Sequence, residues 1–165
     1  MKQRSQILEF SLAIILNFVP LILFWIDGTW RSSISDYAYS NFSYVFVFLI
    51  TLSGSLFVFN GFGLQRHWYN IFLGLGLFGV ALTPCRDYAT IHYVFASVFF
   101  VGSVLAIQLS SDRRFRLQKN IISVPIGLAL VAHFLFGWYS LLVAEWIAIV
   151  PISVHFILKS INQDK

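Results

Sequence analysis

Six long apolar runs dominate this chain of 165 residues and decide the solvent in which it folds. They occupy residues 9–26, 42–62, 68–84, 91–109, 121–139 and 141–158. A helix needs about 20 mostly apolar residues to cross the hydrocarbon core of a bilayer. Hydrophobic residues make up 58% of the chain and charged residues 11%. In a soluble domain, about 45–50% of the residues are apolar and about 25% are charged. We therefore expect an all-α polytopic membrane protein, with a bundle of six transmembrane helices in a single domain over residues 1–165.

The fifth and sixth runs are almost continuous in the sequence. One helix over residues 121–158 would be about 57 Å long, because each residue adds about 1.5 Å, and no ordinary bilayer covers that length. The segment "GWYS" at 137–140 offers a glycine, two aromatic residues that favour the membrane interface, and a serine. The sequence therefore predicts a tight hairpin here, with a re-entrant pair of helices as the alternative.

The positions of the lysines and arginines predict the orientation. Six spans place both termini on one side of the membrane, and cytoplasmic loops carry an excess of basic residues. Nine basic residues fall on the side of the termini, namely Lys2, Arg4, Arg66, Arg113, Arg114, Arg116, Lys119, Lys159 and Lys165, against Arg31 and Arg86 on the other side. We expect a bacterial inner (plasma) membrane protein with cytoplasmic N- and C-termini and an uncleaved first span. The net charge of +4 is then topological and does not indicate nucleic acid as a partner.

The stretch "RSSISDYAYSNF" at 31–42 is unusually rich in hydroxyl groups for a loop between two apolar runs. Ionisable groups within a membrane are costly and usually face a protein interior or a water-filled cavity. Five such groups share the outer half of the predicted bundle and come from five segments, and with three loop residues they form the predicted pocket. Its residues are Ser33, Ser35, Asp36, Tyr37, Asp87, His92, His133 and Glu145.

This set admits three chemical interpretations. A polar pocket of this kind would bind a lipid headgroup or a small amphiphile. Alternatively, His92 and His133 with Asp87 would ligate zinc, which leaves a position for an activated water molecule, while Glu145 or Asp36 handles protons. No fixed ligand spacing such as HExxH is present. A purely structural interpretation is that Glu145 and His133 pair across two helices and that the loop caps the second helix at Ser35–Asp36 or at Ser40–Asn41.

Small residues form two patches, "TLSGS" at 51–55 and "GLGLFG" at 74–79. Small side chains let transmembrane helices approach closely. The patches favour packing within the chain, and they also offer faces for a homo-oligomer or a channel-like subunit. Cys85 is the single cysteine, so an internal disulfide is excluded.

Three short segments, "SISDY", "GVALTPCRDYATIHYVFASVFF" and "VAEWIAI", resemble a family of small, largely uncharacterised six-span bacterial membrane proteins. The matching positions are Ser33, Ser35, Tyr37, Pro84, His92, Ala96, Phe99, Phe100 and Glu145. Thr83 departs from the pattern, which has phenylalanine before the proline. The layout is similar to the domain-of-unknown-function 998 group and to FRAG/DRAM-like membrane proteins, a resemblance that implies no known activity.

A more remote resemblance connects the layout with the alkaline ceramidase and adiponectin-receptor superfamily. That resemblance implies a zinc held by three histidines, an aspartate and a serine in a bundle of seven spans. This chain has one span fewer and lacks the serine-x3-histidine and histidine-x3-histidine spacings. The expected function is therefore binding of membrane lipids or small amphiphiles in an outward-facing pocket. The alternatives are a metal-dependent lipid amidase or esterase and a structural or channel-like oligomeric subunit.

Overall fold

Six α-helices and one short 3₁₀ helix account for the described parts of the chain. The computed structural model describes residues 2–62, 68–109 and 116–162. In chain order the elements are α1 (Lys2–Asp27), η1 (Ser35–Tyr39), α2 (Ser43–Phe62), α3 (Tyr69–Leu82), α4 (Ala89–Leu109), α5 (Arg116–Phe136) and α6 (Leu141–Asn162). The all-helical fold is as predicted, because long runs of apolar residues satisfy their backbone polar groups within a helix.

Five of these helices are long and apolar enough to cross a membrane, namely α1, α2, α4, α5 and α6. The sixth, α3, has 14 residues and would be about 21 Å long at about 1.5 Å per residue. It ends at Leu82, just before Pro84, which has no N–H to continue a helical ladder. The Thr83 hydroxyl and backbone N–H both donate to the carbonyl of Gly79 and close this end.

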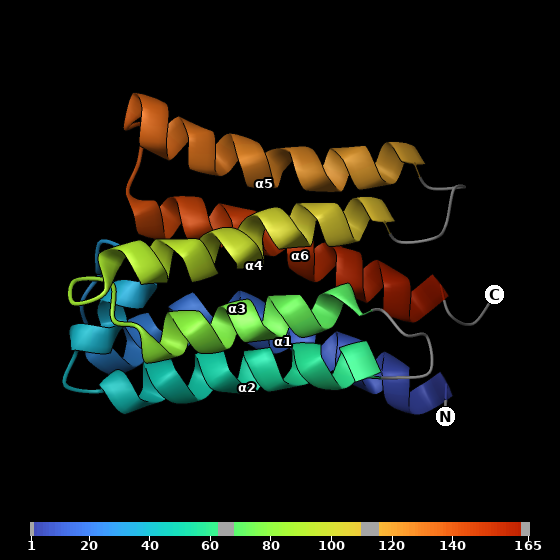
Figure 1. Ribbon diagram of the computed structural model, residues 1–165, viewed down its shortest axis with the longest axis horizontal. Helices are drawn as coiled ribbons and strands as arrows, with labels where there is room; N and C mark the ends of the chain where they lie inside the picture. The colour runs from blue at the N-terminus through green and yellow to red at the C-terminus, as the bar shows by residue number, and fades with distance from the viewer. Residues whose placement is uncertain (1, 63–67, 110–115, 163–165) are drawn as a thin grey trace.

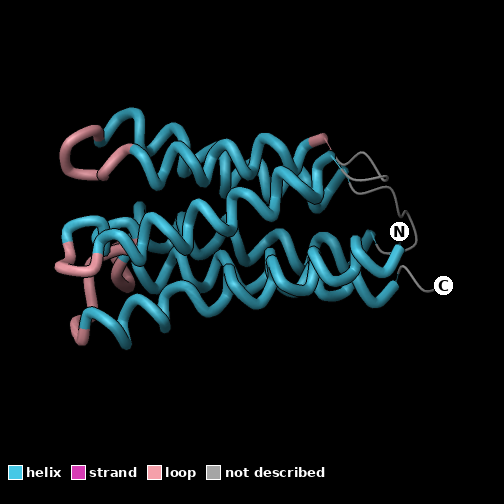
Figure 2. Tube along the Cα trace, turned by 90° about the horizontal axis from the view of Figure 1, so that it is seen from below, coloured by secondary structure: helices cyan, strands magenta, loops and turns pink. Residues whose placement is uncertain are grey.

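The helices run side by side along the long axis of the molecule (Figure 1). The start of α1 and the end of α6 lie at the same end of the bundle. The loop that contains η1, the loop from α3 to α4 and the turn from α5 to α6 lie together at the opposite end (Figure 2). Three segments far apart in the sequence are therefore neighbours at this loop end.

Aromatic side chains form the centre of the core where three helices meet. Phe57 of α2 is fully buried and lies edge-on to Phe99 of α4, with ring centroids 5.8 Å apart. It lies edge-on to Phe156 of α6 as well, at 5.3 Å. Edge-to-face contacts at these distances are favoured by the quadrupoles of the rings. This cluster joins α2, α4 and α6.

The small-residue patches bring α2, α3 and α4 close together within the chain. A Cβ atom added at Gly74 of α3 would lie 2.5 Å from the carbonyl oxygen of Gly54 in α2. A Cβ atom at Gly79 would lie 2.0 Å from the ring of Phe95 in α4. These glycines therefore pack against other helices of the same chain. The homo-oligomer stays a prediction, and its contacts between protomers would have to use other surfaces.

The predicted hairpin between the last two helices is present. Gly137 adopts a positive φ of 61° directly after Phe136, where α5 ends, and α6 begins at Leu141. Glycine reaches this left-handed conformation without a steric penalty, which makes it the usual residue beyond a helix C-terminus. The Gly137 N–H donates to the carbonyl of His133 and closes the helix end.

One local prediction about the polar loop was wrong. Ser35 and Asp36 do not begin the second helix, because residues Ser35–Tyr39 form the separate helix η1 and α2 begins at Ser43. The alternative cap at Ser40–Asn41 agrees better with the structure, since the Ser40 hydroxyl accepts a hydrogen bond from the N–H of Phe42 at 3.1 Å. Local contacts and contacts with α6 both hold this segment. The Asp36 N–H donates to the Ser33 hydroxyl at 3.1 Å, and Ser32 and Ile34, which precede η1, bond to Leu142 and Glu145 of α6.

Candidate functional site: a polar cavity at the loop end

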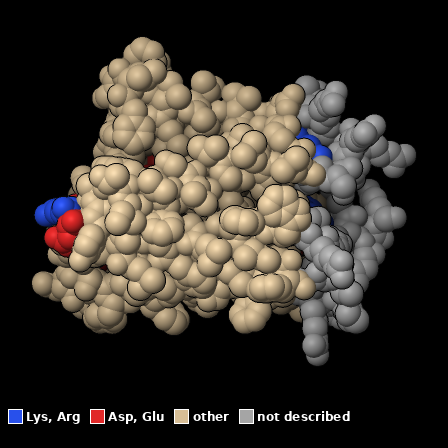
Figure 3. Space-filling model, viewed as in Figure 1, with Lys and Arg blue, Asp and Glu red and all other residues tan. Residues whose placement is uncertain are grey.

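A cavity of about 280 Å³ lies at the loop end, and we refer to it as the loop-end cavity. Four elements and two loops contribute to its wall. The lining residues are Ser32, Ser33, Ser35 and Asp36 around η1, Cys85 and Arg86 before α4, His92, Tyr93, Ala96, Ser97, Phe100 and Val101 of α4, Leu130 and Phe134 of α5, and Leu141 and Glu145 of α6. On the face shown in Figure 3, charged side chains gather at the two ends of the molecule, and the wide band between them is almost entirely uncharged.

Glu145 connects α6 to the polar loop. Its Oε2 atom accepts a hydrogen bond of 2.7 Å from the backbone N–H of Ile34. A second bond, between two backbone groups, runs from the Leu142 N–H of α6 to the carbonyl of Ser32 at 2.8 Å. Together these bonds hold the serine-rich segment against the first turn of α6. The Glu145 Oε1 atom makes no hydrogen bond within the described residues and remains available to a molecule in the cavity.

Asp36 is the most connected polar group of the cavity. It is 7% exposed, and its two carboxylate oxygens have different partners. Oδ2 accepts a hydrogen bond from the Ser32 hydroxyl at 3.2 Å, and Oδ1 pairs with the Arg86 guanidinium at 2.5 Å. The Arg86 side chain itself is 62% exposed. This ion pair joins the loop after α1 to the loop before α4.

His92 is held in one orientation by the end of α3. Its ring is 3% exposed, and Nδ1 lies 2.6 Å from the carbonyl oxygen of Thr83. A carbonyl only accepts, so Nδ1 carries the proton, and in the neutral ring Nε2 has the lone pair. Nε2 makes no hydrogen bond in the described part of the chain. Thr83, the departure from the resembled family, thus orients His92 through its backbone.

One carboxyl group around the cavity has no charged partner among the described residues. Arg86 and Asp36 compensate each other at 2.5 Å, and Glu145 has only a backbone N–H as its partner. A smaller cavity of about 40 Å³ shares Ser35, His92, Ala96, Phe100 and Glu145 with the loop-end cavity and is otherwise lined by apolar residues such as Leu16 and Ile149. Glu145 and His92 therefore stand where the polar cavity meets the apolar core.

The remaining predicted pocket residues lie outside the cavity wall. Tyr37 is fully buried, and its hydroxyl donates to the carbonyl of Thr29 at 3.0 Å. Burial raises the pKa of Tyr37, so the phenol stays a protonated donor. Asp87 is exposed and accepts a hydrogen bond from the Tyr39 hydroxyl at 3.1 Å. Five predicted residues, Ser33, Ser35, Asp36, His92 and Glu145, share the cavity, whereas Tyr37, Asp87 and His133 support its surroundings.

His133 closes the hairpin between α5 and α6. Its Nδ1 donates to the carbonyl of Tyr139 at 2.7 Å, and the Tyr139 hydroxyl donates to the carbonyl of Ala129 at 3.0 Å. His133 and Glu145 therefore each bond to a backbone group rather than to one another among the described residues. The hypothesis of a pair between these two side chains was wrong.

The candidate zinc ligands do not meet. His92 faces Thr83, His133 faces Tyr139, and Asp87 faces Tyr39. Over the ranges 2–62, 68–109 and 116–162, no group of three or more His, Cys, Asp or Glu side chains is arranged to hold a metal ion. The described residues thus offer no built site for the zinc of the hydrolase alternative.

Sequence reasoning missed several polar residues that the fold uses. Arg86 and Ser32 line the cavity, although only their neighbours Asp87 and Ser33 were predicted as pocket residues. Their positions beside these two residues were the sequence signal that could have identified them. A buried ion pair lies toward the other end of the bundle, with Lys159 Nζ 2.6 Å from Glu9 Oε1. Glu9 is fully buried. The sequence signal for this ion pair was the acidic residue Glu9 at the start of the apolar run 9–26.

Comparison with known proteins places the chain in a family but assigns no activity. A family model described as "Family of unknown function (DUF7103)" matches residues 18–160. This is a different uncharacterised family from the domain-of-unknown-function 998 group that the motifs resemble. No curated protein and no solved structure matches the chain. Because the match includes all of α2, α3, α4 and α5, most of α6 and the last part of α1, the chain belongs to the family of unknown function DUF7103.

Proposed function

We propose that the chain is a six-span inner-membrane protein with cytoplasmic termini and with the loop-end cavity on the outer side. The alternating direction of the helices and the common end of α1 and α6 support an even number of spans. The short helix α3 lies between α2 and α4, and neighbouring helices can cover the ends of a short span. The excess of basic residues on the side of the termini supports the orientation.

Within this topology, the loop-end cavity binds a lipid headgroup or a small amphiphile. The observation that carries this proposal is the convergence of Asp36, Arg86, His92 and Glu145 from four separate segments on one cavity of about 280 Å³. Ligand sites are commonly concave and mostly apolar, with a few convergent polar groups that fix orientation. The α4 and α5 side chains Phe100, Leu130 and Phe134 supply the apolar part.

The charge balance favours a headgroup that carries an ammonium. Because Arg86 already compensates Asp36, the Glu145 carboxylate is the group left for a cationic partner. Charged groups in a region of low dielectric constant need a partner to offset their desolvation. A zwitterionic headgroup places its ammonium at Glu145 and its phosphate toward the exposed Arg86 guanidinium.

Thermal unfolding in an uncharged detergent tests this function. The added amphiphiles share one alkyl chain and carry a phosphoethanolamine, a phosphoglycerol or a sugar headgroup. We expect the phosphoethanolamine compound to raise the unfolding temperature most, in a saturable manner. Glu145→Gln keeps an acceptor for the Ile34 N–H and removes the charge, so it should abolish the preference while the fold is retained.

Asp87→Asn is the matched control, since it removes one carboxylate at the same end of the molecule but outside the cavity wall. It should leave the preference among the headgroups intact. Equal stabilisation by all three amphiphiles in the wild-type protein, or a preference unchanged in Glu145→Gln, would refute headgroup binding in this cavity.

A further inference from the structure

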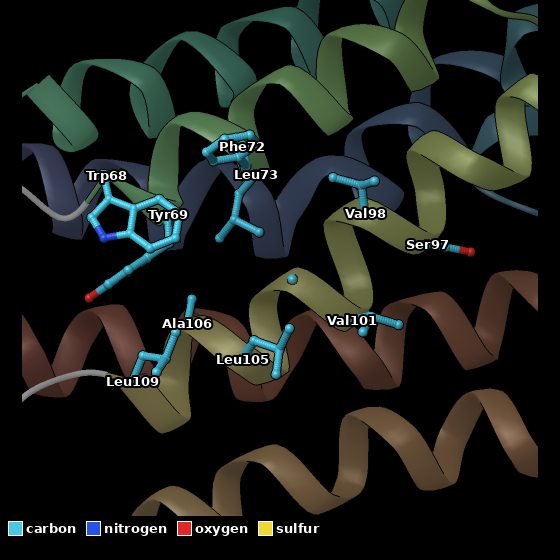
Figure 4. Close-up of a pocket in the computed structure, with 11 residues that line it drawn as sticks. Trp68, Tyr69, Phe72, Leu73, Ser97, Val98, Val101, Leu105, Ala106 and Leu109 are labelled. Carbon is cyan, nitrogen blue, oxygen red and sulfur yellow. The ribbon is translucent and has the colours of Figure 1, made fainter.

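A second concave surface lies on the outside of the bundle between α3 and α4, and we refer to it as the α3–α4 groove. It has a volume of about 460 Å³ and is almost entirely apolar. Figure 4 shows Trp68 and Phe72 on the α3 side and Leu105 and Leu109 on the α4 side. Gly102 and Ala106 are the small residues that leave room between these walls.

The α3–α4 groove and the loop-end cavity share part of their wall. Ser97 and Val101 of α4 line both. Val101 is 58% exposed, so this junction is open to the outside of the bundle. A molecule that occupies the polar cavity can therefore continue past Ser97 into the apolar groove without passing through the core.

The groove has the length of a lipid chain. From Ser97 to Leu109 the α4 axis rises about 18 Å at about 1.5 Å per residue. Half of the hydrocarbon core of a bilayer is about 15 Å thick. The polarity changes in the same direction, from the charged groups of the loop-end cavity to the aliphatic and aromatic side chains of the groove.

We propose that the two surfaces form one site for a single membrane lipid, with the headgroup in the loop-end cavity and one alkyl chain in the α3–α4 groove. This inference rests on the proposed function, because it takes the headgroup position from it. The wall shared at Ser97 and Val101, and the Glu145 carboxyl group without a charged partner, favour this occupant. A helix from a second protomer would fill the groove but leave that carboxylate unmatched.

The groove determines where the lipid chain lies more than how tightly the lipid binds. A lipid chain that moves from the bilayer into the groove exchanges one apolar environment for another, so hydrophobic transfer supplies little driving force. The headgroup contacts then set the affinity, and the shape of the groove sets where the chain lies. The test must therefore report the place of the chain rather than the strength of binding.

Photolabelling with two forms of one phosphoethanolamine lipid makes this test. One form carries a diazirine on the headgroup and the other carries it near the end of a chain. The full-length protein is placed in vesicles of phosphoglycerol lipid, irradiated, digested and mapped by mass spectrometry. We expect the headgroup probe to label the wall of the loop-end cavity and the chain probe to label α3 and α4 between Trp68 and Leu109. Excess unlabelled phosphoethanolamine lipid should lower both labels at least fivefold.

Two tryptophan variants separate the groove from the surrounding surface. Leu105→Trp fills the groove, whereas Leu128→Trp adds the same bulk to an exposed position of α5 outside both surfaces. Leu105→Trp should reduce the groove label at least fivefold and leave the headgroup label unchanged, and Leu128→Trp should change neither label.

The outcomes distinguish this inference from the proposed function. Absence of a competable headgroup label in the cavity would overturn the proposed function. A headgroup label in the cavity with the chain label on α5 near Leu130 and Phe134 would overturn only the chain position. A groove label that resists competition, or that falls equally in both tryptophan variants, would show bulk lipid or a partner helix and would overturn the inference as well.

Discussion

The Glu145 carboxylate bonds to the backbone of a residue 111 positions away, and this contact is one of those that hold the polar loop against α6. Ile34 is buried, so its N–H loses a partner and gains no water when the carboxylate is removed. Glu145→Ala should lower the free energy of unfolding by about 1–3 kcal/mol. Glu145→Gln should retain most of the stability, because its amide oxygen accepts the same bond. Reversible unfolding in mixed micelles measures both, and an equal loss in the two variants would contradict this role.

The buried pair of Glu9 and Lys159 provides a second prediction at the scale of single residues. Removal of one member of a buried ion pair leaves the other uncompensated and costs about 3–5 kcal/mol, whereas replacement of both is often tolerated. Lys159→Met should therefore be strongly destabilising, because Glu9 is fully buried. The double variant Glu9→Gln, Lys159→Met should recover a large part of the loss. Reversible unfolding in mixed micelles measures both variants. A double variant less stable than Lys159→Met alone would exclude a stabilising ion pair between Glu9 and Lys159.

At the scale of helices, close approach of α2 and α3 depends on the absence of a side chain at Gly74. An alanine Cβ there would meet the Gly54 carbonyl oxygen at 2.5 Å, and backbone cannot give way as a side chain can. Gly74→Ala should cost about 1–3 kcal/mol as an overpacking change. Gly127→Ala in α5 is the control, since a Cβ atom there meets nothing within 4 Å. It should be neutral or stabilising by up to about 1 kcal/mol. Equal effects at the two positions would argue against tight α2–α3 packing.

At the scale of the whole molecule, the single cysteine provides a test of orientation. Cys85 is partly exposed at the loop end and is the only thiol in the chain. A membrane-impermeant maleimide should label it in intact cells if this end is outside. Asn120→Cys, introduced together with Cys85→Ser, places the thiol at an exposed position near the opposite end of the bundle. That variant should react only after permeabilisation, and the reverse pattern would invert the proposed topology.

Several features of the fold follow from the sequence because they depend only on the length and composition of a single segment. Transfer of an apolar segment into lipid depends on its length and composition, so the helical runs and their approximate limits are readable from hydropathy. The hairpin at Gly137 is readable for a similar reason, since a glycine between two apolar runs is the residue that accepts a positive φ. The sequence did not predict η1. The residues just before it bond to Glu145 and Leu142 of the last helix, and such long-range contacts cannot be read from a local pattern.

What the sequence by itself determined is therefore an all-helical chain suited to a membrane, with polar groups collected toward one end. Only the tertiary structure decided which of those groups share a cavity. It brought Asp36, His92 and Glu145 to one wall, added Arg86, and turned Tyr37, Asp87 and His133 toward other partners. The physical reason is that depth in a bilayer depends on position along one helix. Convergence depends on how six helices rotate and pack against each other, and no single segment encodes that.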